Sequence, residues 1–289
     1  MRLLTLFMLM FAFAVMLSQS GCKNRDANHD ESSSESSSES SNESSSESSS
    51  ESSNRSKPTT ELDSRREYIE QQEEKVSEEA QARKGRSMTT LIAEQVPVLE
   101  GLPLIATEAE STRRTTEQVA RRAMALCIVA VKGEGVEQEI IDELVKDYDI
   151  ASALTPNEKQ FIDNPSPTQH ERVQFAWRYE CYWVMLWSLG FIDELERPDK
   201  ICDVKMAVSF LRQNGNEGFI KKAKLRSQSE ILDAADLIYR YHWAVRDASI
   251  NDEPIPAGLD SGVVMERHYA LNWLIGYLGQ AWDDVSTDT

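Results

Sequence analysis

Apolar residues are unevenly distributed along this chain of 289 residues. A first apolar run covers residues 3–17, and a long polar region follows until about Met88. From there on apolar and aromatic residues recur, and all six tryptophans lie in this part. Their spacing follows the period of about 3.6 residues that marks an amphipathic helix. Roughly 200 residues therefore supply the core, which is enough for one domain.

The segment 115–133 shows how the helices are predicted. Thr115 is followed three residues later by Gln118, the spacing of a capping box, in which each side chain bonds the backbone N–H of the other residue. Apolar positions then repeat on one face from Val119 to Ala130. Gly133 ends the pattern, as glycine often ends a helix.

Comparable signals predict helices in six further segments, over residues 136–148, 155–163, 166–190, 203–215, 227–248 and 260–279. No stretch alternates convincingly with a period of two, and no Asn-Gly or Asp-Gly turn joins two β-rich runs. We therefore expect an all-α fold: a single globular domain of about seven to nine helices over residues 87–289, preceded by a disordered tether.

The helix expected to begin at Ser166 and Pro167 and to end at Gly190 is predicted to be central. From Cys181 to Ile192 only Ser188 is polar. A helix that is apolar all round is buried on all sides, and twelve residues are too few to span a membrane.

Residues 1–21 have the order of a secretory signal: Arg2, the apolar run and then "SQSGC". As a helix the run would measure about 22 Å, short of a membrane core of about 30 Å. "SGC" resembles the end of a bacterial lipobox, in which Cys22 would be acylated, although Gln19 replaces the usual aliphatic residue. The alternative is cleavage after Ser20, which would give a secreted or periplasmic protein. We favour a lipoprotein of the cell envelope, and Lys23 favours the outer membrane.

Residues 22–60 contain the unit "ESSSESSSESSN" twice in succession. Glutamates recur at every fourth position, so they would repel one another along one face of a helix. Because no apolar residue is available to bury, we expect a disordered tether. Residues 61–86 remain charged but gain helix formers, so we expect an exposed helix that is loosely attached.

The net charge of −18 argues against nucleic acid as a partner, because a phosphate backbone needs a basic surface. A local exception is the group Lys221, Lys222, Lys224 and Arg226. We interpret it as a solvated basic face in preference to an anion site.

Charged and polar residues interrupt three of the apolar helices, and burying a charge requires a partner. Arg178 and Glu180 are two residues apart on one helix and face different directions, so we expect their partners to come from other helices. The candidates are Arg178, Glu180, Asp236, Arg240, His242, Arg246, Glu266, Arg267, His268 and Asn272. We expect them to converge on one network with aromatic walls, formed by Trp177, Trp183, Trp243 and Trp273.

Two interpretations of this cluster compete. It could be a pocket in which His242 or His268 acts as acid or base, oriented by Glu180, Asp236 or Glu266. It could instead be an ion-pair network that fixes how the helices pack, which is the interpretation we favour.

Other chemistry lacks support in the sequence. There is no H-E-x-x-H or C-x-x-C metal motif, no G-x-S-x-G nucleophile and no dinucleotide fingerprint, so we expect no metal and no cofactor. Cys127 and Cys181 read as buried thiols, whereas Cys202 precedes a helix start, where thiolate character is favoured. The aspartates of "WDDVSTDT" are better explained by a tail docked through Trp282 than by a cation site.

Three stretches together resemble a bacterial family, domain-of-unknown-function family 4272: "RTTEQVARRAMAL", "QFAWRYECYWVMLWSLGFIDEL" and "SEILDAADLIYRYHWAVRDA", the last followed by "ERHYALNWLIGY" and "WDDVSTDT". The resemblance covers residues 87–289, and it implies a single domain without implying an activity. The signal and the Ser/Glu repeat lie outside it.

Three functions are therefore open. The first, which we favour, is a cell-envelope lipoprotein that is held to the membrane by a lipid on Cys22 and binds a protein or small-molecule partner without chemistry. The second is an envelope hydrolase that uses the Arg/His/Glu cluster. The third is a structural or immunity-type partner protein.

Overall fold

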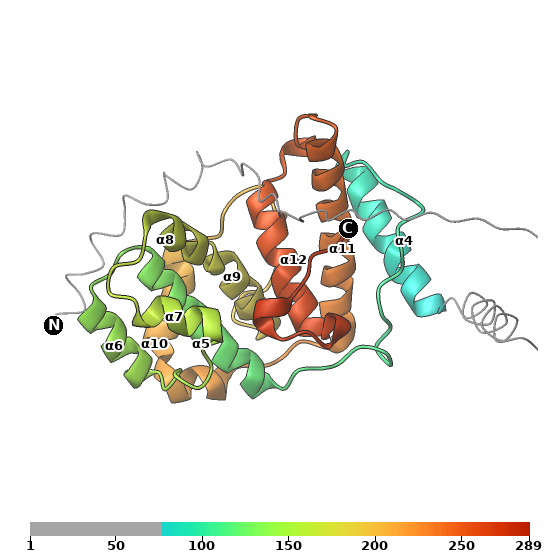
Figure 1. Ribbon diagram of the computed structural model, residues 1–289. Coiled ribbons are helices and arrows are strands. Elements are labelled where there is room, and N and C mark those ends of the chain that lie inside the picture. The colour runs from blue at the N-terminus through green and yellow to red at the C-terminus, as the bar shows by residue number, and fades with distance from the viewer. Residues whose placement is uncertain (1–76) are drawn as a thin grey trace, which may run out of the picture. The chain divides into compact units, whose positions relative to one another are not determined.

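Helices make up the regular secondary structure of residues 77–289, the part of the chain that the computed structural model describes (Figure 1). The predicted signal, the predicted tether and residues 61–76 of the charged linker lie outside these residues. The all-α fold is confirmed: no strand occurs in the described part, and the number of helices falls within the expected range. None of the helices described is long and apolar enough to cross a membrane.

Reciprocal capping boxes begin four of the helices, because a side-chain oxygen before the helix accepts from a backbone N–H that has no partner within it. The boxes are formed by Thr115 with Gln118, Thr155 with Glu158, Thr168 with Glu171 and Ser227 with Glu230. They begin helices α5 (Thr116–Gly133), α7 (Pro156–Asp163), α8 (Gln169–Ala176) and α11 (Gln228–Ile250).

The remaining helices are α4 (Glu78–Ala93), α6 (Gln138–Asp147), α9 (Arg178–Ser188), α10 (Val204–Lys222) and α12 (Ser261–Ile275). Three short 3-10 turns follow α11 and α12, at Pro256–Gly258, Tyr277–Gly279 and Trp282–Asp284. Asp260 accepts from the first backbone N–H groups of α12, and Gly276 ends that helix in the left-handed conformation.

Five helices pack side by side in the order α5, α9, α12, α11 and α4 (Figure 1). Helices α6, α7, α8 and α10 pack on α5. Every residue of α9 from Tyr179 to Ser188 is buried, as expected for a helix that is apolar all round. Helix α5 is likewise buried from Ala123 to Gly133.

The long helix predicted over residues 166–190 is divided in two. It begins after Thr168, whose capping box with Glu171 supersedes the predicted start at Ser166 and Pro167. Trp177 separates α8 from α9, and Glu180 N–H donates to its carbonyl at 3.0 Å, a tightened turn. The Trp177 ring packs against Gly262 of α12, where an added Cβ would lie 2.6 Å from the ring. This contact requires a residue without a side chain at position 262.

Two further helix ends differ from the prediction. Helix α10 continues to Lys222, although Gly215 interrupts it with a φ of 62°, so glycine bends this helix instead of ending it. Helix α12 ends at Ile275 and not at residue 279, because Gly276 takes a φ of 68°.

The expectation of a loosely attached segment up to residue 86 is wrong from Glu78 onward. Arg83, near the middle of α4, is 1% exposed, and its Nε donates to Asp233 of α11 at 3.1 Å. Ala80 and Leu91 are also buried. This packing was not predicted because Arg83, which attaches α4 to α11, is a charged residue, and charged residues are expected to face solvent.

Candidate functional site

Two neighbouring residues of α12 form crossed ion pairs with α9. Arg178 Nη1 donates to Glu266 Oε2 at 2.7 Å, and Arg267 Nε donates to Glu180 Oε2 at 3.0 Å. The prediction that Arg178 and Glu180 take partners from another helix is confirmed. Both partners come from α12, because successive helical residues point about 100° apart and can reach two positions on α9.

The pair between Glu180 and Arg267 is deeply buried, and further hydrogen bonds support both members. Each residue is 2% exposed. Glu180 also accepts from the backbone N–H of Cys202, and Arg267 Nη1 donates to the carbonyl of Glu196 at 2.6 Å. Burial raises the pKa of Glu180, and Arg267 opposes that rise. The arrangement satisfies two buried charges and leaves neither available for proton transfer.

His242 of α11 and His268 of α12 bond to each other. Their Nδ1 atoms lie 2.8 Å apart, so one imidazole donates and the other accepts. Burial lowers the pKa of His242 to about 4, with a contribution from the charge of Arg246, and lowers that of His268 to about 3. Both rings are therefore neutral at pH 7. Nothing in this geometry makes either of them the acid or base of a hydrolase.

Three carboxylates were predicted to orient a histidine. In the described structure each of them forms an ion pair with an arginine. Glu180 pairs with Arg267 and Glu266 with Arg178, whereas Asp236 forms two bonds of 2.8 Å with Arg240. The last pair lies on another side of α11, where Arg240 Nη2 reaches the carbonyl of Pro103. The ten candidates thus form separate groups around α11 and α12 and not the one network expected.

The predicted aromatic walls do not enclose one site either. Trp177 packs on Gly262, Trp183 is buried in the core, and Trp243 is half-buried. Trp273 lies under the Arg114 guanidinium at 4.3 Å and meets the edge of Trp282 at 5.5 Å.

The C-terminal tail is docked through Trp282, as the sequence suggested. Trp282 is 4% exposed, with Arg122 over its ring at 4.8 Å. Its carbonyl accepts from the Tyr269 hydroxyl, and Asn272 donates to the carbonyl of Ser286 at 2.9 Å. Asn272 therefore has a structural partner in the tail.

The three cysteines of the part of the chain that the structure describes are all buried. Cys127, Cys181 and Cys202 are unpaired and buried, and burial raises the pKa of each thiol. For Cys202 this corrects the expectation of thiolate character, because desolvation outweighs its place before a helix. Within the described residues no group of three or more His, Cys, Asp or Glu side chains is placed to hold a metal ion.

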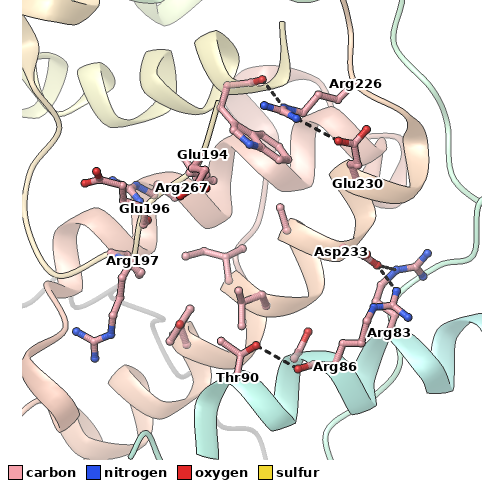
Figure 2. Close-up of a pocket in the computed structure, with 18 of the residues that line it drawn as sticks. Arg83, Arg86, Thr90, Glu194, Glu196, Arg197, Arg226, Glu230, Asp233 and Arg267 are labelled. Carbon is pink, nitrogen blue, oxygen red and sulfur yellow. Dashed lines mark hydrogen bonds and ion pairs between the residues drawn. The ribbon is translucent and has the colours of Figure 1, made fainter. Parts of the chain in front are cut away.

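A cleft of about 580 Å³ lies between α4, α11 and the segment that follows α9 (Figure 2). Its apolar lining comes from Trp187, Leu195, Pro198, Ala234, Leu237 and Ile238. Charged residues surround this floor: Arg83, Arg86, Glu94, Asp193, Glu194, Glu196, Arg197, Arg226, Glu230, Asp233 and Arg267. Arg267 is the one member of the predicted polar cluster among the lining residues.

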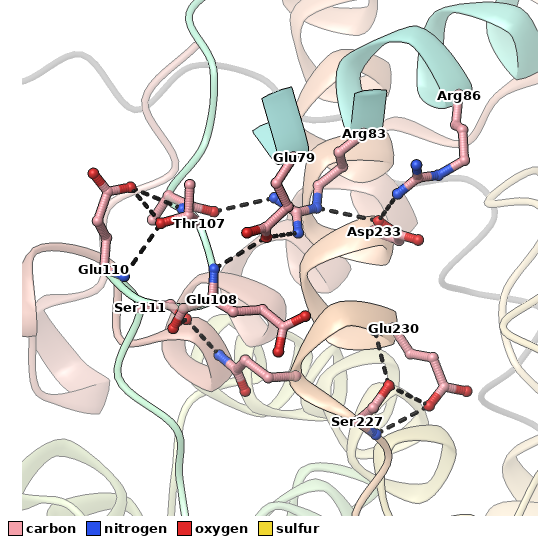
Figure 3. A network of polar contacts seen from close by, with 12 residues as sticks. Glu79, Arg83, Arg86, Thr107, Glu108, Glu110, Ser111, Ser227, Glu230 and Asp233 are labelled. Atoms are coloured by element: carbon pink, nitrogen blue, oxygen red, sulfur yellow. Dashed lines mark hydrogen bonds and ion pairs between the residues drawn. The ribbon is translucent and has the colours of Figure 1, made fainter. Parts of the chain in front are cut away.

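Ion pairs hold the α4 wall of the cleft in place (Figure 3). Arg83 bridges Glu79 of its own helix and Asp233 of α11, at 2.6 and 3.1 Å. The bond to Arg83 lowers the pKa of Glu79. Glu94, after the end of α4, accepts from Arg197 and from the buried Tyr241 hydroxyl, both at 2.7 Å. The wall is thus fixed to α11 and to the opposite side of the cleft.

Sequence reasoning missed this cleft because the charged segment up to residue 86 was interpreted as linker. One signal was present: Arg83, Ser87, Thr90 and Glu94 follow the i, i+4, i+7, i+11 spacing of a helix face. All four line the cleft. The pattern consists of polar residues, whereas an amphipathic helix is usually identified by its apolar face.

We predict that Arg267→Ala lowers the free energy of unfolding by about 3–5 kcal/mol, because it leaves the buried Glu180 charge without its partner. The double substitution Glu180→Leu with Arg267→Met should regain part of this loss. Urea unfolding followed by circular dichroism measures both. Lys200→Ala, which removes the exposed pair with Glu196, should cost less than about 1 kcal/mol. Equal losses in Arg267→Ala and Lys200→Ala would contradict the role assigned to burial.

The histidine pair predicts a loss of stability in acid. Because the folded pKa values of about 4 and 3 lie below the ordinary 6.5, the unfolded chain binds protons first as the pH falls. The free energy of unfolding should therefore be unaffected by protonation of the histidines above about pH 6.5. It should fall as the pH drops towards 4, by about 1.4 kcal/mol per pH unit for each histidine. Unfolding at a series of pH values tests this. His268→Phe should flatten the dependence, whereas His170→Gln, at an exposed position, should leave it unchanged.

Comparison with curated proteins and with solved structures gave no significant match. Comparison with family models gave a match that covers residues 83–285. This range begins inside α4, so the family domain includes most of the helix that forms one wall of the cleft. The chain belongs to the family described as domain of unknown function DUF4272.

Proposed function

We propose that the domain binds a partner, without chemistry of its own, in the cleft between α4, α11 and the segment after α9. The observation that carries this proposal is the cleft itself, which joins an apolar floor to a charged rim in a volume of about 580 Å³. Sites for small molecules have this character and a size of roughly 300–1,000 Å³.

The hydrolase alternative is less well supported. A hydrolase of the kind considered needs a histidine and a carboxylate together in an accessible pocket. The residues that line this cleft include no histidine and no cysteine. His242 and His268 are bonded to each other and are 5% and 2% exposed.

We also propose that the domain works at the cell envelope, as a lipoprotein anchored through Cys22. The support is the sequence: the short apolar run, the "SGC" end and the Ser/Glu repeat between that cysteine and the domain. The outer membrane is the location favoured by Lys23.

Filling the cleft tests the binding proposal. Ala234, on α11, is half-buried and lines the cleft, so Ala234→Trp should place an indole ring over its apolar lining. We expect protein purified under native conditions to carry a bound ligand in native mass spectrometry, and Ala234→Trp to lose it. Ala151→Trp makes the same change at an exposed position outside the cleft and should keep it. An equal load in both variants, or a wild-type protein without any ligand, would contradict the proposal.

The anchor is tested separately. Cys22→Ser should move the protein from the membrane fraction to the soluble fraction, because the acylated residue is lost. Mass spectrometry of the mature wild-type N-terminus should show a lipid-modified Cys22. An unmodified chain that starts at Gly21 would refute the lipoprotein proposal and leave the binding proposal intact.

A further inference from the structure

The arginines of the cleft are already used by the protein itself. Arg83 donates from Nε to Asp233, from Nη1 to the Ala106 carbonyl and from Nη2 to Glu79. Arg197 uses its three nitrogens on Glu94, Asp199 and the carbonyl of Ala257. These guanidinium groups hold the walls together.

Arg226 is committed in the same way. Its Nε donates to the Trp187 carbonyl at 2.8 Å, Nη1 donates to Glu230, and Nη2 donates to the carbonyls of Ile192 and Asp193. This arginine belongs to the basic group at residues 221–226, and its guanidinium bonds to other residues of the domain. Arg86 remains more accessible, with a side chain 57% exposed, but it too pairs with Asp233.

Two carboxylates that line the cleft keep one oxygen without a hydrogen bond to the described part of the chain. Asp233 receives both of its arginines on Oδ1, and Glu94 receives both of its donors on Oε2. The second oxygen of each carboxylate has no hydrogen bond within the described residues. Asp193 and Glu194, at the rim, are exposed, and none of the described contacts involves their side-chain oxygens.

A ligand that satisfies these atoms must donate hydrogen bonds or carry positive charge. The protein as a whole is acidic, with a net charge of −18, so its long-range field also attracts cations. Below the rim lie Ala234, Leu237 and Ile238 of α11, beside Leu195 and Pro198. This floor suits an apolar body that is attached to the charged head.

We propose that the cleft binds a small organic cation, an amine joined to an apolar body, with its head beside the exposed carboxylates of Asp193 and Glu194 at the rim. This inference rests on the proposed function, because it assigns a chemical class to the ligand of the same cleft. The positive charge of an ammonium group is attracted to the two carboxylates, and salt weakens this attraction.

Three probes with the same chain and different heads test the assignment: octylamine, octanol and octanoate. Isothermal titration calorimetry of the full chain at low salt should show octylamine binding at least tenfold more tightly than either of the others. Raising the salt concentration should reduce the difference in affinity between octylamine and the other two probes. Ala234→Trp should abolish binding, and Ala151→Trp should not. Ala234→Leu serves as a milder filling variant if the tryptophan variant fails to fold.

A matched pair of charge variants locates the head group. Asp193→Asn with Glu194→Gln should weaken octylamine binding by roughly three- to tenfold and leave octanol unchanged. Glu143→Gln with Asp147→Asn removes the same two charges from the exposed face of α6, away from the cleft. Equal weakening in the two double variants would show that net charge alone attracts the amine, and it would overturn the assignment of the rim.

The outcomes separate this inference from the proposed function. Octanoate or octanol binding as tightly as octylamine, and lost in Ala234→Trp, would overturn the cationic ligand while the cleft kept its binding role. Binding of no probe, or binding that Ala234→Trp leaves intact in a folded protein, would overturn both.

Discussion

The crossed ion pairs between α9 and α12 fix the register of the two central helices. Glu266 and Arg267 are neighbours of opposite charge, and each faces a residue of opposite charge on α9. If α12 moved by one turn, Ala270 and Leu271 would take their places and four charges would lose their partners. Because an unpaired buried charge costs several kcal/mol, this register is strongly favoured over its neighbours.

The cleft inherits its shape from these pairs. Arg267 bonds Glu180 on one side and the Glu196 carbonyl on the other, so it holds the segment after α9 against α12. The next residue, Arg197, reaches Glu94 beyond the end of α4, and Glu94 accepts from Tyr241 of α11. A continuous series of polar contacts therefore runs from the buried core to both walls of the cleft. Removing Arg267 would disturb the cleft as well as the core.

Local patterns predicted most of the helices, because a capping box or a helix-ending glycine acts within a few residues of the chain. The predicted boxes at Thr115, Thr155 and Ser227 are all present. Burial of the apolar helix around Val184 was predictable for the same reason. Partner choice was not, since the contact between His242 and His268 depends on how α11 and α12 cross.

The α4 wall escaped prediction for a different reason. Its docking residues are charged, and a charged helix that pairs with another helix has the same sequence pattern as one that faces water. Only the partner, Asp233, distinguishes the two cases, and it lies 150 residues away. The cleft was therefore not predicted, although several of the residues that line it share one face of a helix in the sequence.

The charged residues of the cleft fall into two sets, those bonded within the domain and those exposed at its rim. The arginines are held by intramolecular bonds, whereas no hydrogen bond or ion pair among the described residues involves the side chain of Asp193 or Glu194. Substitutions at these two positions should cost little stability, because exposed side chains without hydrogen-bond partners contribute little to folding. The charge of this rim can thus vary while the arginine framework of the cleft stays intact.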